Sequence, residues 1–159
     1  MSLFSSLFRK KTSVPLWTGR TLLAREFQQT LGAWEIPSDN TYAEINSAAL
    51  PGYYDWFRTK LYDLGVTRWD QKQDCDNFAT LYAAFLQLRL YLGQWERDPL
   101  PQAEGVAVAQ YWYRPNLGNE LHAINAVLTE KGLVFIEPQT GQQVTVTFQE
   151  QATRLRCIF

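Results

Sequence analysis

Three side chains suited to thiol chemistry follow one another along this chain. Cys75 lies in the run Asp-Cys-Asp-Asn-Phe-Ala over residues 74–79, His122 is the only histidine, and Glu137 ends an apolar run. A thiolate is a nucleophile, an imidazole can accept and return a proton, and a carboxylate can orient that imidazole. This order predicts a catalytic triad of Cys75, His122 and Glu137.

The composition is that of one globular domain. Of the 159 residues, 46% are hydrophobic and 19% are charged, so the chain can bury a core without a disulfide or metal. We expect an N-terminal arm over residues 1–17 and a single domain over residues 18–159. The net charge of -1 argues against a nucleic-acid binder.

The cysteine count and the hydropathy pattern bear on the compartment. Two cysteines, Cys75 and Cys157, are too few for a disulfide framework, so we expect both to be thiols. No apolar run approaches the roughly 18 residues of a membrane span. Near the N-terminus the basic residues follow the apolar ones, the reverse of a signal peptide. The chain is therefore expected to be cytoplasmic or virion-associated, without stable membrane insertion.

The elements that must position the triad are predicted from periodicity and from glycine and proline punctuation. We expect a core helix that begins at the cysteine and ends before Gly93. Helices are also expected over residues 18–31, after 38–39 and over 53–64, and strands over 106–114, 121–128, 133–137, 142–148 and 155–159. Helices followed by strands predict an α+β domain, in which N-terminal helices pack on a C-terminal antiparallel sheet.

The position of Cys75 at a helix start both favours and opposes a thiolate. The partial positive charge of a helix N-terminus lowers a thiol's pKa, whereas the neighbours Asp74 and Asp76 should raise it. Asp74 is a good N-cap, and a charged His122 would offset the remaining negative charge. A cation held by the two aspartates, or a structural buried thiol, is the alternative.

Strand parity relates His122 to the acid. A two-residue turn at 130–131 or 131–132 places even-numbered residues of one strand opposite odd-numbered residues of the next. Glu137 and Gln139 then share the face of His122 in either register, so either could orient the imidazole. A three-residue loop would break this relation, and a lone histidine is often structural.

Three motifs resemble the transglutaminase-like and papain-like cysteine peptidase superfamily. Residues 74–79 are similar to the Asp-Cys-(Asp/Glu)-Asp-(Phe/Tyr)-Ala run of bacterial transglutaminase-like cysteine peptidases. Residues 122–125 resemble a His-x-Trp-Asn segment, with Ile124 for the aromatic residue, and residues 133–140 resemble a strand ending Asp-Pro-x-Thr, with Glu137 for Asp. The resemblance covers residues 74–141. The residue order is also similar to a calcium-dependent papain-like domain of a fungal lectin, which implies a test for calcium.

The resemblance implies a papain-like or transglutaminase-like fold with Cys75 as nucleophile, His122 as base and then acid, and Glu137 as orienter. One oxyanion donor is the backbone N–H of Cys75, and the second is expected among Trp69, Gln71 and Gln73. Papain-like enzymes use an upstream glutamine, which favours Gln71 or Gln73.

The expected activity is thiol-dependent acyl transfer through a Cys75 thioester. With water as acceptor the protein is a cysteine peptidase or amidase acting on a peptide or protein, and with an amine it is a transglutaminase. Aromatic side chains over residues 111–113 could line a substrate groove or pack in the core. The alternative is a non-catalytic interaction or structural module that keeps the fold.

Overall fold

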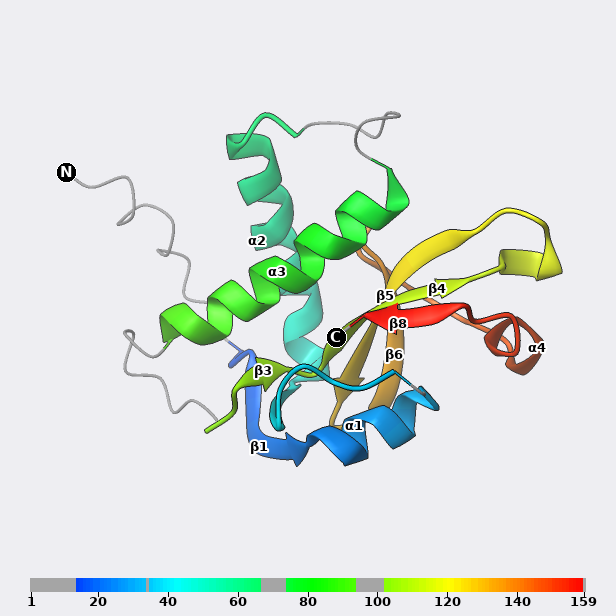
Figure 1. Cartoon of the computed structure of the whole chain (residues 1–159). Helices are drawn as coiled ribbons and strands as arrows, with labels where there is room; N and C mark the ends of the chain where they lie inside the picture. The colour runs from blue at the N-terminus through cyan, green and yellow to red at the C-terminus, as the bar shows by residue number, and fades with distance from the viewer. Residues whose placement is uncertain (1–13, 34, 67–73, 94–101, 159) are drawn as a thin grey trace.

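A mixed eight-stranded sheet with helices on both faces forms the centre of the molecule (Figure 1). The computed structural model describes residues 14–33, 35–66, 74–93 and 102–158. In chain order the elements are β1 Trp17–Leu23, α1 Ala24–Leu31, β2 Thr41–Ile45, η2 Ser47–Ala49, α2 Leu50–Asp63, α3 Cys75–Gly93, β3 Gly105–Val106, β4 Val108–Tyr113, η3 Pro115–Leu117, β5 His122–Thr129, β6 Gly132–Glu137, β7 Gln142–Val144, α4 Phe148–Gln151 and β8 Arg156–Ile158.

The sheet follows the order β1-β2-β5-β4-β8, with β3 paired to β2, β6 paired to β5, and β7 paired to β6. β2 runs parallel to β3 and to β5. The other pairs are antiparallel. β5 therefore lies between β4 and β6 and connects all parts of the sheet.

The expected fold class, helices packed on a C-terminal antiparallel sheet, is wrong in two respects: where the strands lie in the sequence and how they are paired. Strands β1 and β2 precede helices α2 and α3, so the sheet is not confined to the C-terminal half. The parallel pairing of β2 with β3 and β5 makes the sheet mixed rather than antiparallel. The apolar spacing over residues 18–31 fits a helix, but only residues 24–31 are helical, because residues 17–23 pair with β2.

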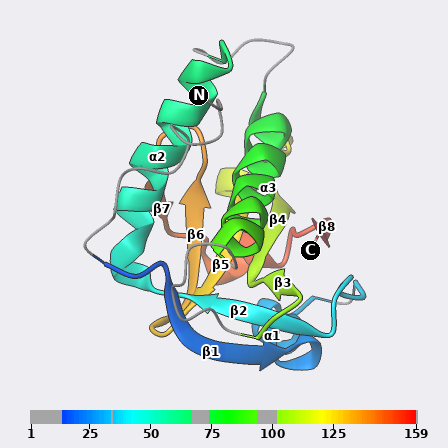
Figure 2. The ribbon, with the colours of Figure 1, turned by 90° about the vertical axis from the view of Figure 1, so that its left-hand side faces the viewer.

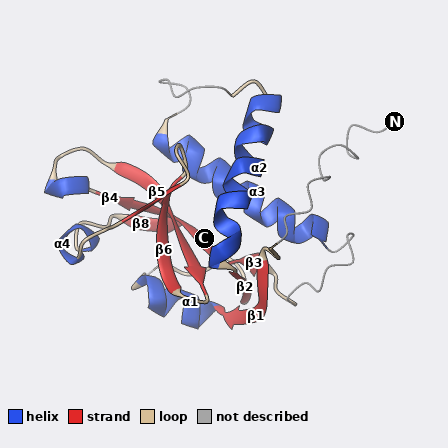
Figure 3. Cartoon of the chain, turned by 180° about the vertical axis from the view of Figure 1, so that it is seen from behind, coloured by secondary structure: helices blue, strands red, loops and turns tan. Residues whose placement is uncertain are grey.

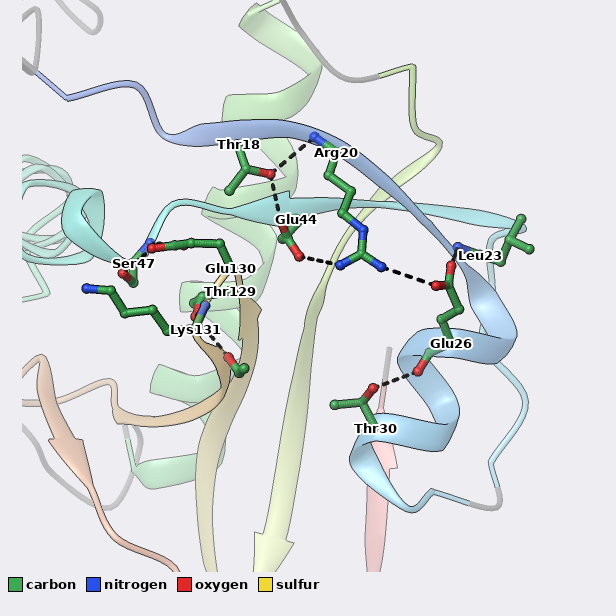
Figure 4. Close-up of polar contacts among 11 residues, drawn as sticks. Thr18, Arg20, Leu23, Glu26, Thr30, Glu44, Ser47, Thr129, Glu130 and Lys131 are labelled. Carbon is green, nitrogen blue, oxygen red and sulfur yellow. Dashed lines mark hydrogen bonds and ion pairs between the residues drawn. The ribbon is translucent and has the colours of Figure 1, made fainter.

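A polar network fixes the change from β1 to α1 (Figure 4). The Glu26 carboxylate accepts the backbone N–H of Leu23 at 2.8 Å and so caps the new helix. Arg20 donates to Glu26 at 3.2 Å and to the buried Glu44 at 3.1 Å, and Thr18 donates to the same Glu44 at 2.8 Å. Glu44 is distant in sequence from both Thr18 and Arg20, so periodicity alone cannot predict where the strand ends.

Two apolar layers cover the two faces of the sheet (Figures 2 and 3). Helices α2 and α3 pack on one face, where Tyr53 and Tyr82 meet edge-on with ring centroids 5.0 Å apart. Helix α1 packs on the other face, where Phe27 contacts Tyr42 at 5.1 Å between centroids. Each fully buried aromatic ring contributes roughly 1.5–3 kcal/mol by leaving water, so α3 has a firm apolar base on the sheet.

The remaining elements agree only in part with the sequence pattern, and the helix expected after residues 38–39 is wrong, because residues 41–45 form β2 and pair with β1. Helix α2 ends before Gly65, whose φ of 81° is easy for glycine. The expected strand over residues 106–114 is divided at Ala107, since β3 pairs with β2 whereas β4 pairs with β5. The expected strand over 142–148 ends at Val144, and Thr147 caps α4. Among the described segments, no helix is long and apolar enough to cross a membrane.

Candidate thiol site

The N-terminus of α3 positions Cys75. The Asp74 carboxylate accepts the backbone N–H of Asn77, and its Oδ1 accepts the Asn77 side chain at 3.1 Å. The Asp74 carbonyl accepts the N–H of Phe78 at 3.1 Å, which closes the first turn. Asp74 is therefore the N-cap that the sequence predicts, and the half-buried Cys75 is the first helical residue.

The β5–β6 hairpin brings the acid to the histidine. Its register pairs Thr129 with Gly132 and Ala126 with Phe135, which leaves a two-residue turn at residues 130–131. Glu137 consequently lies on the face of His122, and the His122 Nε2 and Glu137 Oε2 atoms are 2.6 Å apart. The predicted parity between the two strands is confirmed.

Cys75 and His122 meet across the start of α3 and the start of β5. A side-chain hydrogen bond with His122 is the main cause that lowers the pKa of Cys75, and the backbone N–H of Ala123 adds to it. Partial burial and the charge of Asp74 oppose this shift. The hydrogen bond that the His122 ring makes to Cys75, and then the one to Glu137, raise the pKa of His122 to about 9, and desolvation opposes them.

The lowered pKa of Cys75 and the raised pKa of His122 both favour the ion pair of a thiolate and an imidazolium over the neutral pair. Because Nε2 of His122 faces Glu137, the ring's Nδ1 is the nitrogen that is left for the thiol. In the charged ring, Nε2–H donates to the carboxylate, which fixes the plane of the imidazole. The arrangement provides a nucleophilic sulfur and a proton donor next to each other.

The two aspartates beside the thiol interact with one another. Their side-chain hydrogen bond is the main cause that lowers the pKa of Asp74 and raises that of Asp76. In the described part of the chain no group of three or more metal-ligating side chains is found, so a cation at this pair stays a prediction.

Glu137 is anchored by the turn that follows it. Its Oε1 accepts the backbone N–H of Gln139 at 3.2 Å. The Gln139 carbonyl in turn accepts the hydroxyl of Tyr54 at 2.7 Å and Nη1 of Arg58 at 2.8 Å, both on α2. Gln139 therefore contributes its backbone to the site, and helix α2 holds the acid through this turn.

Other predicted residues divide between the core and the undescribed segments. Trp69, Gln71 and Gln73 lie outside the described residues. Tyr111 and Tyr113 are buried in the core, while Arg156 covers the half-buried Trp112 at 4.7 Å from its ring centroid. Cys157 is buried opposite Tyr111, and burial raises its pKa to about 12, so it is an unreactive thiol.

Two hydrogen bonds between the sheet and α3 were not predicted from the sequence. The side chain of Gln110 donates to the Asp76 carbonyl at 2.9 Å, and that of Asn125 donates to the Ala79 carbonyl at 2.9 Å. An amide inside an apolar strand is the only sequence signal of such a role, since neither partner is near in sequence.

Comparison with known proteins gives structural matches only. No protein-family model matches the chain, and no curated protein matches it. A structure of the Polyporus squamosus lectin bound to the human-type influenza-binding epitope Neu5Aca2-6Galb1-4GlcNAc matches with a TM-score of 0.61 and 17% identity. A "PSL1a-E64 complex" matches with a TM-score of 0.57 and 19% identity. Each match covers 87% of this chain, which spans about half (49%) of those chains.

These findings correct the expected family and activity. The assignment to the transglutaminase-like or papain-like cysteine peptidases is overturned, because the matched structures include a lectin and no family model matches. The expected thiol-dependent acyl transfer, and with it the description as a hydrolase or thiol protease, loses its basis for the same reason. At this level of identity the matches show the fold alone.

Proposed function

We propose that this chain is a ligand-binding domain whose binding site is the Cys75 thiolate paired with the His122 imidazolium. The observation that carries the proposal is the 2.6 Å contact between His122 and Glu137, at a histidine that also bonds the thiol of a helix start. The lectin match supports a protein that acts by binding. Cys75 is the nucleophilic group, His122 its charge partner and proton donor, and Glu137 the orienter.

The proposed site can hold a ligand by charge or by one covalent bond. The thiolate and the imidazolium offer an anion and a cation side by side to a polar ligand. Toward an electrophilic carbon, such as that of an epoxide, the Cys75 sulfur forms a C–S bond while the C–O bond breaks. The released oxygen then takes the proton of His122, so that charge and protons balance.

Thiol labelling tests the site. Iodoacetamide is applied over a range of pH values, and peptide mapping follows Cys75 and Cys157 separately. We expect Cys75 to react at least about 10-fold faster than Cys157 near pH 7, and His122→Ala and Glu137→Gln to slow Cys75. The matched control is Glu130→Gln, because Glu130 lies on the same hairpin and bonds Ser47 rather than His122. Equal and slow labelling of both cysteines would refute the proposed site.

A saccharide is the second candidate ligand, and the lectin complex is the observation that favours it. Isothermal titration calorimetry of the folded chain with the trisaccharide of that complex tests this class directly. Binding that is weakened by His122→Ala would place the saccharide at the thiol site. Binding that is unchanged by that variant would separate the two sites, and the absence of heat at millimolar saccharide would exclude this ligand.

A further inference from the structure

Two buried amide side chains lie opposite each other on neighbouring strands beneath α3. Gln110 on β4 pairs in register with Asn125 on β5, and the two residues are 6% and 0% exposed. The same face of the sheet is otherwise apolar at Val108, Val127 and Ile136. A buried amide in such a layer costs free energy unless its hydrogen bonds are made, so both side chains need a partner above the sheet.

The NH2 group of each amide finds that partner in the first turns of α3, whereas Oδ1 of Asn125 has no hydrogen-bond partner among the described residues. Gln110 Nε2 donates to the Asp76 carbonyl at 2.9 Å and to Thr80 Oγ1 at 3.3 Å. Asn125 Nδ2 donates to the Ala79 carbonyl at 2.9 Å. Asp76 directly follows Cys75, so the bonds secure the part of the helix that carries the thiol.

One of the strands that hold these amides also carries His122 and is paired with the strand of Glu137. Asn125 lies on β5 three residues after His122, and its cross-strand partner on β6 is Ile136, the neighbour of Glu137. The two bonds therefore tie the first turns of α3 to β4 and to β5, the strand that carries His122. Strand β6, which carries Glu137, is paired with β5.

We propose that Gln110 and Asn125 are positioning residues that set the contact between the Cys75 thiol and His122; this inference rests on the proposed thiolate site. The apolar contacts of Phe78, Tyr82 and Leu86 keep α3 on the sheet but have no preferred direction. Hydrogen bonds are directional. The amides therefore determine how far α3 is shifted and rotated over β5, and the thiol–imidazole contact depends on that placement.

The test compares the pH dependence of Cys75 alkylation by iodoacetamide in the wild type, Gln110→Met and Asn125→Leu. The matched control is Tyr53→Phe, which removes a buried 2.8 Å bond from Tyr53 to the carbonyl of Tyr82, further along α3. We expect the two amide variants to react about 10-fold to 100-fold more slowly at pH 7 and to require a higher pH. The control should lower the melting temperature without changing the pH profile.

A purely structural role gives a different result. If Gln110→Met and Asn125→Leu lower the melting temperature as Tyr53→Phe does but keep the wild-type pH profile, the positioning role is refuted. Where circular dichroism shows that either variant has unfolded, Gln110→Asn replaces it, because a side chain one methylene shorter withdraws the amide from Asp76 while keeping its polarity. Equal rates of Cys75 alkylation in the wild type and in His122→Ala would refute the proposed thiolate site itself. That outcome differs from the one that refutes only the positioning role of the two amides.

Discussion

Replacing Glu137 with glutamine will lower the pKa of His122. Replacing Cys75 with alanine, as a separate variant, will lower it by more. His122 is the only histidine, so its ring signals can be followed by NMR in an untagged chain without full assignment. Its pKa is raised from 6.5 to about 9, with the Cys75 bond as the largest cause and the Glu137 bond as the next. A difference of about 2.5 pKa units corresponds to roughly 3 kcal/mol in favour of the charged ring.

Each variant removes one of the two contributions. Loss of a neighbouring opposite charge changes a pKa by about 1–3 units, so each single variant should lower the His122 pKa by about 1–2 units. Glutamine keeps the shape of Glu137 and an oxygen that can accept Nε2–H, so the effect isolates the charge. The control Glu130→Gln should leave the titration unchanged. If His122 titrates near 6.5 in the wild type, or if Glu137→Gln leaves its pKa in place, the reasoning about the site is refuted.

Four further outcomes are expected. In the Cys75→Ala background, Glu137→Gln should cost about 1–2 kcal/mol of unfolding free energy at pH 6, measured with urea. A raised histidine pKa stabilises fully below the ordinary value near 6.5, and this effect is lost as the pH rises through the folded value. That value is about 9 with Cys75 present and lower once Cys75, its largest cause, is replaced, so the cost should vanish by pH 10. Gly141→Ala should destabilise the fold by about 1–3 kcal/mol, because φ is 73° and a Cβ would lie 2.2 Å from Tyr54 Cγ; an unchanged urea midpoint would contradict this packing. Asp74→Asn keeps a good cap but removes a charge that raises the pKa of Cys75, so alkylation should become faster at pH 6, and slower alkylation would show that the cap was lost. If the acid pair beside the thiol binds calcium, labelling will be faster with calcium than with a chelator, and equal rates would exclude that coupling.

The core of the site was predictable because its determinants are local. An aspartate before an apolar stripe indicates a helix start, and the two-residue turn at 130–131 fixes the parity of His122 and Glu137. Neither inference depends on how the sheet is ordered. The contact between the start of α3 and the start of β5 depends on tertiary packing. For this contact the sequence gives only the order of Cys75, His122 and Glu137 along the chain.

The remaining features depend on distant partners. The strand over residues 17–23 has a helical spacing, and its pairing with β2 overrides that preference. The parallel pairing of β2 with β3 joins segments that are separated by α2 and α3, and no local pattern predicts it. Gln110 and Tyr54 look like ordinary polar or aromatic residues until the structure places them against Asp76 and Gln139.

The acidic surroundings of Cys75 fit a reactive thiol better than a silenced one. The Asp74 carboxylate accepts the hydrogen bonds of the helix cap. The hydrogen bond with His122 is the largest cause acting on the pKa of Cys75, and the charge of Asp74 is a smaller cause. The net shift of the Cys75 pKa is downward although Asp74 opposes it. The buried Cys157 shows the opposite shift, because desolvation dominates over the nearby charges of Arg154 and Glu35. The contrast between these two cysteines in one chain supports the proposed thiol site at Cys75.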